Sequence, residues 1–394
     1  MAKLLLEIDE SVCSFNGEYY TSYEGQNDFF DRYLRVFDTI KIVCRCEIIS
    51  SLKKKNQPIN NNRIVIVPVP MFRGVAGYFK MQTAIGKHLK NVTEGCDCAI
   101  LRIPSALSVE VYRQLRRKRI PYATEIVYDA KDGSRGSNSL LGRVAWEYQH
   151  YVMKKMSSHA IGVSCVTEFY LQKHYYSKID NSFVSNYSSL SLPSPFYTGP
   201  RIFPVKEVLT ISHVANQIIF NGRKGHNEVI DAVAILKDRG YNVVVKFAGK
   251  DYDNGVALLK QYADRKDVLD RVFFAGFLSR EELEKYLEES DLYVMPTRAE
   301  GLPRVIIEAM AKGLPCLTTD VSGNSELVDK EMLFDYDNTQ ELANKIENLI
   351  KNPVLYENVS KNNFERSLKY EASILEKRRD EFYNKLKNAG INNK

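Results

Sequence analysis

Two glutamates, Glu300 and Glu308, stand with seven residues between them in a segment that carries strong structural signals. A short apolar run, Leu292–Met295, ends at a proline, and a Gly-Leu-Pro turn then leads into a helical pattern. Carboxylates accept hydrogen bonds, and the paired hydroxyls of a ribose or a hexose donate them. The strand-loop-helix order therefore predicts two carboxylates that border one sugar-binding pocket, although this spacing alone also arises by chance.

The helix after this turn is expected to run from about Pro303 to Lys312. Proline suits the first helical turn, because its missing N–H is not needed there. Gly313 and Pro315 suit the end of the helix. A helix that begins after a parallel strand presents free N–H groups and a partial positive charge, so its start predicts a place for a diphosphate or for sugar hydroxyls.

A second helix start carries positive charge. Gly222, Arg223, Lys224 and Gly225 directly precede an amphipathic helical pattern. Cations at a helix N-terminus are unfavourable for the helix itself, which indicates a compensating anion such as a diphosphate leaving group. The alternative is a pair of solvated loop cations.

The segment Asp291–Glu326 resembles the glutamate-x7-glutamate motif of retaining glycosyltransferases of family 4, which have the two-domain GT-B fold. The resemblance implies that Glu308 binds the nucleotide ribose. It implies that Glu300 contacts the donor sugar, beside the backbone of Gly301 and Leu302. It also implies a front-face attack in which the leaving phosphate assists deprotonation of the acceptor.

The chain departs from the family pattern at two places. Pro303 cannot donate a backbone hydrogen bond, so the loop offers one N–H fewer. Lys224-Gly225 matches the family's Lys-Gly pair, but His213 stands where the family often has an arginine at the preceding strand end. Either Arg223 supplies that charge, His213 contributes a hydrogen bond, or His213 is an ordinary core or loop residue.

The remaining site predictions concern loops at strand ends. The resemblance indicates that Gly249-Lys250 and Gly276–Ser279 hold the base, and that Asn16-Gly17 lies near the donor phosphates, although turn residues explain the latter equally well. Glu125, Asp129 and Asp132 are expected at the end of the fifth strand, facing a crevice between domains. The predicted catalytic residues are Lys224, Arg223, Glu300 and Asp129; the predicted donor-binding residues are Glu308, Gly301, Leu302, Pro303, Arg304, Gly17, His213 and Leu278.

Apolar runs rich in Val and Ile alternate with helical stretches along the chain, which predicts α/β architecture with two Rossmann-like domains whose parallel sheets face a cleft. The polar segment 188–204, which contains four prolines, interrupts the alternation as a linker would. The expected domains are 1–195 for the acceptor, 196–369 for the nucleotide sugar, and a C-terminal helix, 370–394, that packs back on the first domain.

The 394 residues suit two domains with cores of their own. The positive charge lies in the first half, where 26 Lys and Arg face 18 Asp and Glu, and part of it lies in the run Arg113–Arg119. Such a surface is either an ordinary solvated face or a contact with anionic lipid headgroups. With no apolar run long enough to span a bilayer and an acidic N-terminus, the expected location is the cytoplasm, at the inner face of the membrane.

The seven cysteines and an Asp-x-Asp pair are the two features that could suggest a metal site. Cys44 with Cys46 and Cys96 with Cys98 are expected to be core residues and not a metal site or a bridge. Asp251 and Asp253 follow a strand and would suit a metal on a diphosphate, but a solvated turn is the favoured interpretation. No metal and no cofactor are therefore expected.

The expected function is transfer of a hexose-type sugar, with retention, from a nucleoside diphosphate sugar, with UDP as the expected nucleotide. The expected acceptor is a hydroxyl of a saccharide or lipid-linked acceptor in the assembly of cell-surface polysaccharide or glycolipid. A non-catalytic subunit that binds a sugar nucleotide is the alternative, and a basic nucleic-acid-binding protein is a weaker one. Neither Gly-x-Gly-x-x-Gly nor a P-loop occurs, which argues against a dinucleotide oxidoreductase and a P-loop enzyme.

Overall fold

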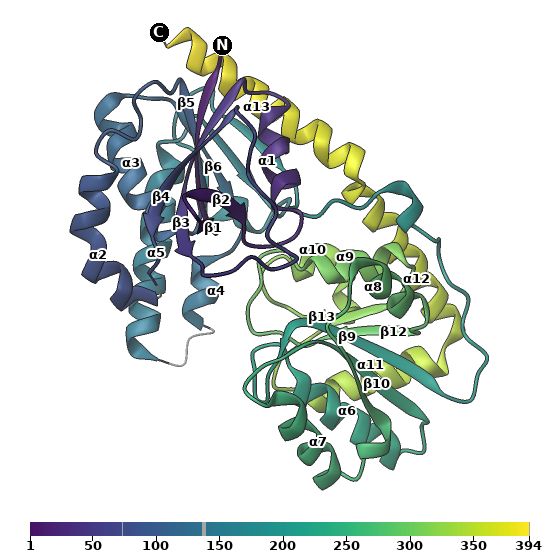
Figure 1. Cartoon of the computed structure of the whole chain (residues 1–394). Helices are drawn as coiled ribbons and strands as arrows, with labels where there is room; N and C mark the ends of the chain where they lie inside the picture. Colours follow the sequence, from purple (N-terminus) through teal and green to yellow (C-terminus); the bar gives the residue numbers. More distant parts are fainter. Residues whose placement is uncertain (73, 136–138, 394) are drawn as a thin grey trace. The chain divides into compact units, whose positions relative to one another are not determined.

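The computed structural model describes residues 1–72, 74–135 and 139–393, and the chain divides into two compact units. Unit 1 comprises Met1–Tyr187 together with the chain from Glu376 onward, and unit 2 comprises Ser188–Leu375. Each unit is a parallel α/β sheet with helices on both faces, in agreement with the fold class that the alternating pattern predicts (Figure 1).

Unit 1 contains an eight-stranded sheet in the order β4-β3-β1-β5-β6-β7-β8, with β2 added antiparallel to β1. Its strands are β1 (Lys3–Phe15), β2 (Glu18–Thr21), β3 (Thr39–Ile48), β4 (Ile64–Pro70), β5 (Cys98–Ile103), β6 (Tyr122–Ile126), β7 (Gly162–Cys165) and β8 (Phe183–Asn186). Its helices are α1 (Gln26–Leu34), α2 (Gly74–His88), α3 (Ala106–Lys118), α4 (Ala130–Arg135), α5 (Leu140–Ser158) and most of α13 (Ala372–Asn392). The central β1 is buried on both faces at Leu4, Leu5 and Leu6, as its continuous apolar run requires.

The first strand is longer than its apolar run predicts. The apolar run Leu4–Ile8 predicts a first strand that ends at Ile8, but β1 continues to Phe15 and turns back into β2. Asn16 and Gly17 form this hairpin turn with φ of 51° and 84°, and Asn-Gly favours such a turn because both residues tolerate positive φ. Gly17 therefore lies at the tip of a hairpin and not directly after a strand that ends at Ile8.

Glu125 of β6 is part of the core of unit 1 and does not lie at an open edge. Its carboxylate accepts hydrogen bonds from the hydroxyls of Tyr33 (2.9 Å), Tyr187 (2.9 Å) and Tyr383 (2.7 Å), and it pairs with Arg102 at 3.1 Å. The expectation that Glu125 faces a ligand is wrong, because four buried partners already satisfy it. One of them, Tyr383, comes from α13, so this carboxylate ties the last helix into unit 1.

Unit 2 contains a six-stranded sheet in the order β11-β10-β9-β12-β13-β14. Its strands are β9 (Leu209–Ile218), β10 (Val243–Asp251), β11 (Val272–Gly276), β12 (Leu292–Met295), β13 (Cys316–Thr319) and the short β14 (Leu333–Phe334), which the helical pattern after Ser322 did not indicate. Its helices are α6 (His226–Asp238), α7 (Gly255–Arg265), α8 (Arg280–Glu288), α9 (Arg304–Ala311), α10 (Asn324–Leu327), α11 (Thr339–Lys351) and α12 (Pro353–Ser367). The strand order reverses between β9 and β12, which is where open parallel sheets bind ligands.

Candidate functional site

The carboxyl ends of β9 and β12 bring two loops together in unit 2. After β9 the chain makes the turn Gly222–Gly225 and enters α6, and after β12 it passes through Pro296–Pro303 into α9. The Arg298 amide donates to the Arg223 carbonyl at 3.0 Å, so the backbone joins the two loops directly. The cationic turn and the first glutamate of the sequence motif are thereby neighbours.

Gly225 makes this approach possible. It is the N-cap of α6 with φ of 73°, and a Cβ at this position would lie 2.3 Å from the Pro296 carbonyl oxygen. Any side chain would be strained by the backbone conformation and would also press against fixed backbone. The glycine of the Lys-Gly pair is therefore required by packing, and it places Lys224 against the loop after β12.

We expect Gly225→Ala to separate these loops and to lower the free energy of unfolding by about 1–3 kcal/mol, the usual cost of a strained backbone with overpacking. Urea unfolding measures this effect. Gly240→Ala is the matched control, because Gly240 also has positive φ (84°) but an added Cβ would meet nothing within 4 Å. Equal behaviour of the two variants would contradict this role of Gly225.

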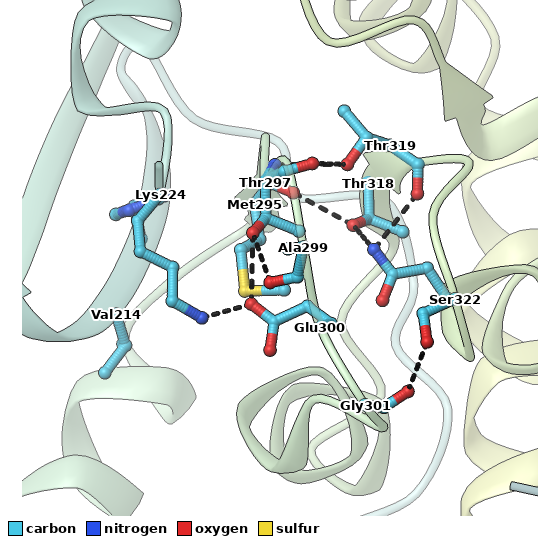
Figure 2. A network of polar contacts seen from close by, with 12 residues as sticks. Val214, Lys224, Met295, Thr297, Ala299, Glu300, Gly301, Thr318, Thr319 and Ser322 are labelled. Atoms are coloured by element: carbon cyan, nitrogen blue, oxygen red, sulfur yellow. Dashed lines mark hydrogen bonds and ion pairs between the residues drawn. The ribbon is translucent and has the colours of Figure 1, made fainter. Parts of the chain in front are cut away.

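Lys224 and Glu300 form an ion pair at the centre of the site (Figure 2). The Lys224 ammonium donates to Glu300 Oε1, and the Thr297 hydroxyl donates to the same oxygen at 3.1 Å. The Glu300 side chain is 12% exposed and that of Lys224 is 22% exposed, so the pair is shielded but reachable. Both contacts use Oε1, which leaves Oε2 to accept from a hydroxyl.

Residues of β13 and the following turn support this loop. The Thr319 hydroxyl donates to the Thr297 carbonyl at 2.6 Å, and the Ser322 hydroxyl donates to the Gly301 carbonyl at 3.2 Å (Figure 2). The Gly323 amide donates to the same Gly301 carbonyl at 3.1 Å. Asn324 is fully buried and donates to Thr318 and Thr319 at 2.9 and 3.0 Å. The segment Ser322–Asn324 thereby braces the backbone beside Glu300.

Helix α9 begins with Pro303 as its N-cap and Arg304 as its first, exposed residue. Glu308 lies in its second turn and is half-buried. Burial raises the pKa of the Glu308 carboxyl, while Arg304 and Arg280 act in the opposite direction. The start of α9 thus combines free backbone N–H groups with a carboxyl group whose pKa is raised.

Two buried histidines pack beside each other behind the cationic turn. His213 Nδ1 donates to the Val294 carbonyl at 2.8 Å, and its ring lies 4.6 Å from that of His226 between centroids. Burial lowers the pKa of His213 to about 4, and burial lowers the pKa of His226 well below its usual value. Both rings are therefore neutral at neutral pH, so His213 does not replace the charge of the family's arginine.

These elements enclose a pocket of about 550 Å³ in unit 2. It is lined by Asn216, Gln217, Ile219, Gly222, Arg223, Lys224, His226, Lys250 and Glu300. Three predicted catalytic residues, Arg223, Lys224 and Glu300, thus meet in one cavity. Asn216 and Gln217 were not predicted, because the apolar run Val208–Val214 predicts a strand that ends at Val214, whereas β9 continues to Ile218. His226, the first residue of α6, was not predicted either.

The predicted donor-binding residues are not among the described residues that line this pocket. Gly301, Leu302 and Pro303 are buried in the loop before α9, Leu278 is half-buried before α8, and His213 is fully buried. Gly17 and Asp129 belong to unit 1.

Asp129 is fully buried at the carboxyl end of β6, where its Oδ1 accepts from the Tyr175 hydroxyl at 2.7 Å. Since that hydroxyl donates its only hydrogen to Asp129, His150 Nδ1 donates to the Tyr175 oxygen at 2.8 Å. Among the described residues nothing hydrogen-bonds to Asp129 Oδ2, although it is buried. A buried carboxylate oxygen without a partner is suited to accept a substrate hydroxyl.

The described part of the chain lacks two features, a cluster of metal ligands and a membrane-spanning helix. Within residues 1–72, 74–135 and 139–393, no three His, Cys, Asp or Glu side chains are grouped as a metal site requires. Asp251 accepts from the Val256 amide at 3.1 Å, in a turn before α7. None of the helices in these residue ranges has the length and apolarity needed to span a bilayer.

Residues 215–366 match the protein-family model described as glycosyl transferases group 1. The matched range contains the whole pocket, Glu308 and the bracing segment after β13. The match to this family therefore lies within unit 2, and the chain, with its two parallel-sheet units, has the GT-B fold.

The chain is also similar to individual known proteins. The chain is 25% identical over 340 residues to protein CapJ of Staphylococcus aureus, covering 84% of this chain and 82% of that protein. It is 29% identical over 131 residues, 33% of this chain and 29% of the other, to the UDP-Gal:alpha-D-GlcNAc-diphosphoundecaprenol alpha-1,3-galactosyltransferase of Escherichia coli. The structure of sucrose-phosphate synthase from Thermosynechococcus elongatus superimposes with a TM-score of 0.72 at 17% identity and covers 99% of this chain and all of that one.

Proposed function

We propose that this protein is a retaining glycosyltransferase of family 4 that transfers a hexose-type sugar from a nucleoside diphosphate sugar, with UDP as the nucleotide. The observation that carries the proposal is the pocket in which Arg223, Lys224 and Glu300 meet at the N-terminus of α6. Cations and a helix start suit a diphosphate, and a carboxylate suits sugar hydroxyls. The E. coli relative, whose name specifies UDP-Gal, supports UDP.

On the phosphate side, Lys224 leaves Glu300 and pairs with the diphosphate of the bound donor. Arg223, exposed at the rim, supplies the planar fork for phosphate oxygens. As the bond to the sugar breaks, negative charge develops on the leaving diphosphate, and these fixed cations with the α6 N-terminus stabilise it. The proposed reaction uses these groups and no divalent metal.

On the sugar side, Glu300 Oε2 accepts from donor-sugar hydroxyls while Thr297 holds Oε1. Glu308 accepts from the ribose hydroxyls, and Gly301, Leu302 and the start of α9 contact the donor through backbone atoms. Arg304 and Leu278 complete the donor contacts. In the retaining, front-face reaction the leaving phosphate oxygen takes the proton of the attacking acceptor hydroxyl, so no protein nucleophile is needed.

The acceptor is proposed to bind unit 1, where Asp129 Oδ2 accepts a hydrogen bond from one of its hydroxyls. The tyrosine and histidine behind Asp129 fix the orientation of the carboxylate. Gly17 remains a predicted donor contact. A saccharide or lipid-linked acceptor suits the basic N-terminal half of the chain. The name of the E. coli relative likewise specifies a diphosphoundecaprenol-linked substrate. We therefore propose that the protein acts in the assembly of cell-surface polysaccharide or glycolipid, at the cytoplasmic face of the membrane.

A thermal-shift panel of nucleotides and nucleotide sugars tests the donor assignment, because a bound donor raises the melting temperature by mass action. We expect UDP and at least one UDP-sugar to raise it, and uridine to act weakly. The selected donor is then incubated with a crude glycolipid fraction, and the anomeric configuration of the product is read by NMR. No shift with any nucleoside diphosphate, or an inverted product, contradicts the proposal. Donor binding without transfer would favour a non-catalytic subunit.

Glu308→Ala should weaken UDP binding by about 1.5–3 kcal/mol, the value of hydrogen bonds to a charged group. The ionised carboxylate is the better acceptor, so affinity should fall as the pH falls through the Glu308 pKa. Because that pKa is raised by burial, the loss should begin at a higher pH than for an exposed glutamate. Calorimetry across neutral and acid pH measures this, and Glu308→Gln should remove the pH dependence. If the pH dependence of UDP affinity is unchanged in Glu308→Gln, Glu308 is not the group that causes it.

A further inference from the structure

The turn Gly222–Gly225 places two cations side by side at the start of α6. The Gly225 amide donates to the Gly222 carbonyl at 3.2 Å, so Arg223 and Lys224 are the two central residues of a four-residue turn. Adjacent cations repel each other, and cations at a helix N-terminus are unfavourable for the helix. The conformation of this turn therefore depends on contacts from outside it.

Tyr336 supplies one of these contacts from the turn between β14 and α11. Its hydroxyl donates to the Gly222 carbonyl at 3.3 Å. A carbonyl oxygen has two lone pairs, so it can accept from Gly225 and from Tyr336 together. Burial raises the pKa of the Glu228 carboxyl in the first turn of α6, and the nearby Tyr336 hydroxyl acts in the opposite direction. The hydroxyl thus lies where the cationic turn ends and the helix begins.

The ring of Tyr336 contacts the loop that carries Glu300. The Arg298 guanidinium lies over this ring, 4.3 Å from its centroid, which is a cation–π distance. The same guanidinium pairs with Asp337 at 3.6 Å. The Arg298 amide in turn donates to the Arg223 carbonyl at 3.0 Å. Tyr336 and Arg298 therefore close a ring of contacts that joins both loops of the site.

The segment that carries Tyr336 is itself held at both ends. The Asn338 amide donates to the Asp335 carbonyl at 3.0 Å and closes the turn. The Asp335 amide donates to the Glu341 carboxylate at 3.3 Å, and the Asn338 side chain accepts from the Glu341 amide at 3.0 Å as the N-cap of α11. A turn anchored to a helix in this way is a firm support for the tyrosine.

We propose that Tyr336 is a positioning residue of the donor site, which holds the cationic turn and the Glu300 loop at the spacing that the donor requires. Tyr336 is not among the described residues that line the pocket. It acts on Arg223 and Lys224 through the Gly222 carbonyl, and on the Glu300 loop through Arg298. The inference rests on the proposed function, since it concerns the binding of the proposed donor.

Calorimetry with UDP and UMP tests this role in Tyr336→Phe, which keeps the ring over Arg298 and removes the hydroxyl. The affinity for UDP should fall about threefold to tenfold, the net value of one hydrogen bond. The affinity for UMP should fall less, because the turn carries the cations assigned to the diphosphate. Tyr336→Leu also removes the cation–π contact, so its UDP affinity should fall about 10- to 50-fold.

Tyr197→Phe is the matched control. The Tyr197 hydroxyl also donates to a backbone carbonyl at 3.3 Å, that of Ser367, and both tyrosines are half-buried in unit 2. The two Phe variants should lose similar stability in urea, but Tyr197→Phe should bind UDP as the unmodified protein does. In Tyr336→Phe/Lys224→Ala the loss of UDP affinity should be smaller than the two single losses combined, because both changes act on one turn.

Hydrogen exchange of the protein without nucleotide tests the brace separately from the donor. In Tyr336→Phe the amides of Gly225 and Arg298 should exchange at least about threefold faster, because the turn that holds their acceptors is less firmly fixed. In Tyr197→Phe they should exchange at the original rate. Failure of the unmodified protein to bind UDP contradicts the donor proposal, and the exchange rates still decide whether Tyr336 holds the turn.

Three outcomes overturn the proposal. One is unchanged exchange of these amides in Tyr336→Phe. Another is an equal loss of UDP affinity in Tyr336→Phe and Tyr197→Phe. The third is a loss in Tyr336→Phe/Lys224→Ala that equals the two single losses combined, which would show that Tyr336 does not act through the turn.

Discussion

Replacing Lys224 with alanine should lower kcat for sugar transfer about 10²- to 10³-fold, the usual loss when one preorganised donor to a developing charge is removed. The ammonium group lies in the pocket beside Glu300 and at the N-terminus of α6, where the leaving diphosphate is proposed to bind. Lys224→Arg keeps the charge but changes a compact ammonium into a planar fork, so it should recover only part of the rate.

The same variant gives a binding test that does not depend on the acceptor. Lys224→Ala should weaken the binding of UDP much more than that of UMP, because Lys224 is assigned to the phosphate that departs with the nucleotide. Calorimetry with both nucleotides measures this difference. Lys361→Ala, a 63% exposed lysine of α12, is the control and should match the unmodified protein. Equal losses of affinity for UDP and UMP would show that Lys224 does not bind the diphosphate.

The glutamate-lysine pair bears on how the proposed donor would bind. Glu300 and Lys224 pair with each other in the structure, so binding of the proposed donor would exchange one ion pair for contacts to sugar and phosphate. Such a pair keeps two partly shielded charges from being left alone in the pocket. It also explains why two residues with different proposed ligands lie in contact.

The fold was predictable because its signals are local. Buried Val- and Ile-rich runs mark the parallel strands, and Pro303 and Gly313 mark the ends of α9, which spans Arg304–Ala311. Helices after strands at a reversal of strand order then bring Arg223, Lys224 and Glu300 to one edge. Local pattern and sheet topology together were therefore sufficient for the centre of the candidate site.

What the sequence did not indicate depends on contacts between distant residues. Asn216 and Gln217 line the pocket only because β9 continues beside β10 beyond its apolar run. Asn324 braces the Glu300 loop through hydrogen bonds to β13, and a lone asparagine after a strand carries no signal for this. Glu125 was placed at a ligand-binding edge, because its spacing after the strand does not reveal a tyrosine 258 residues away.

Removing that buried carboxylate should be the most destabilising single change in unit 1. Glu125→Ala should lower the free energy of unfolding by about 3–5 kcal/mol, because Arg102, whose side chain is 13% exposed, loses its buried partner and keeps the longer pair, at 3.5 Å, with the more exposed Glu10. Three tyrosine hydroxyls also lose their acceptor, among them Tyr383, which holds α13 against β6. Urea unfolding, fitted with separate transitions for the two units, measures the effect. Glu381→Ala, an exposed site on α13, is the control and should change little.

The pH dependence identifies the cause of this loss. Burial alone would raise the pKa of Glu125, but Arg102 and the tyrosine hydroxyls outweigh it and hold the pKa below the usual 4.5. A carboxyl with a lowered pKa in the folded state stabilises the protein above its unfolded pKa and loses that contribution as the pH falls through the folded pKa. The difference in stability between the unmodified protein and Glu125→Gln should therefore be constant at neutral pH and shrink below about pH 4.5. A difference that stays the same at acid pH would assign the loss to packing and not to the ionised carboxylate.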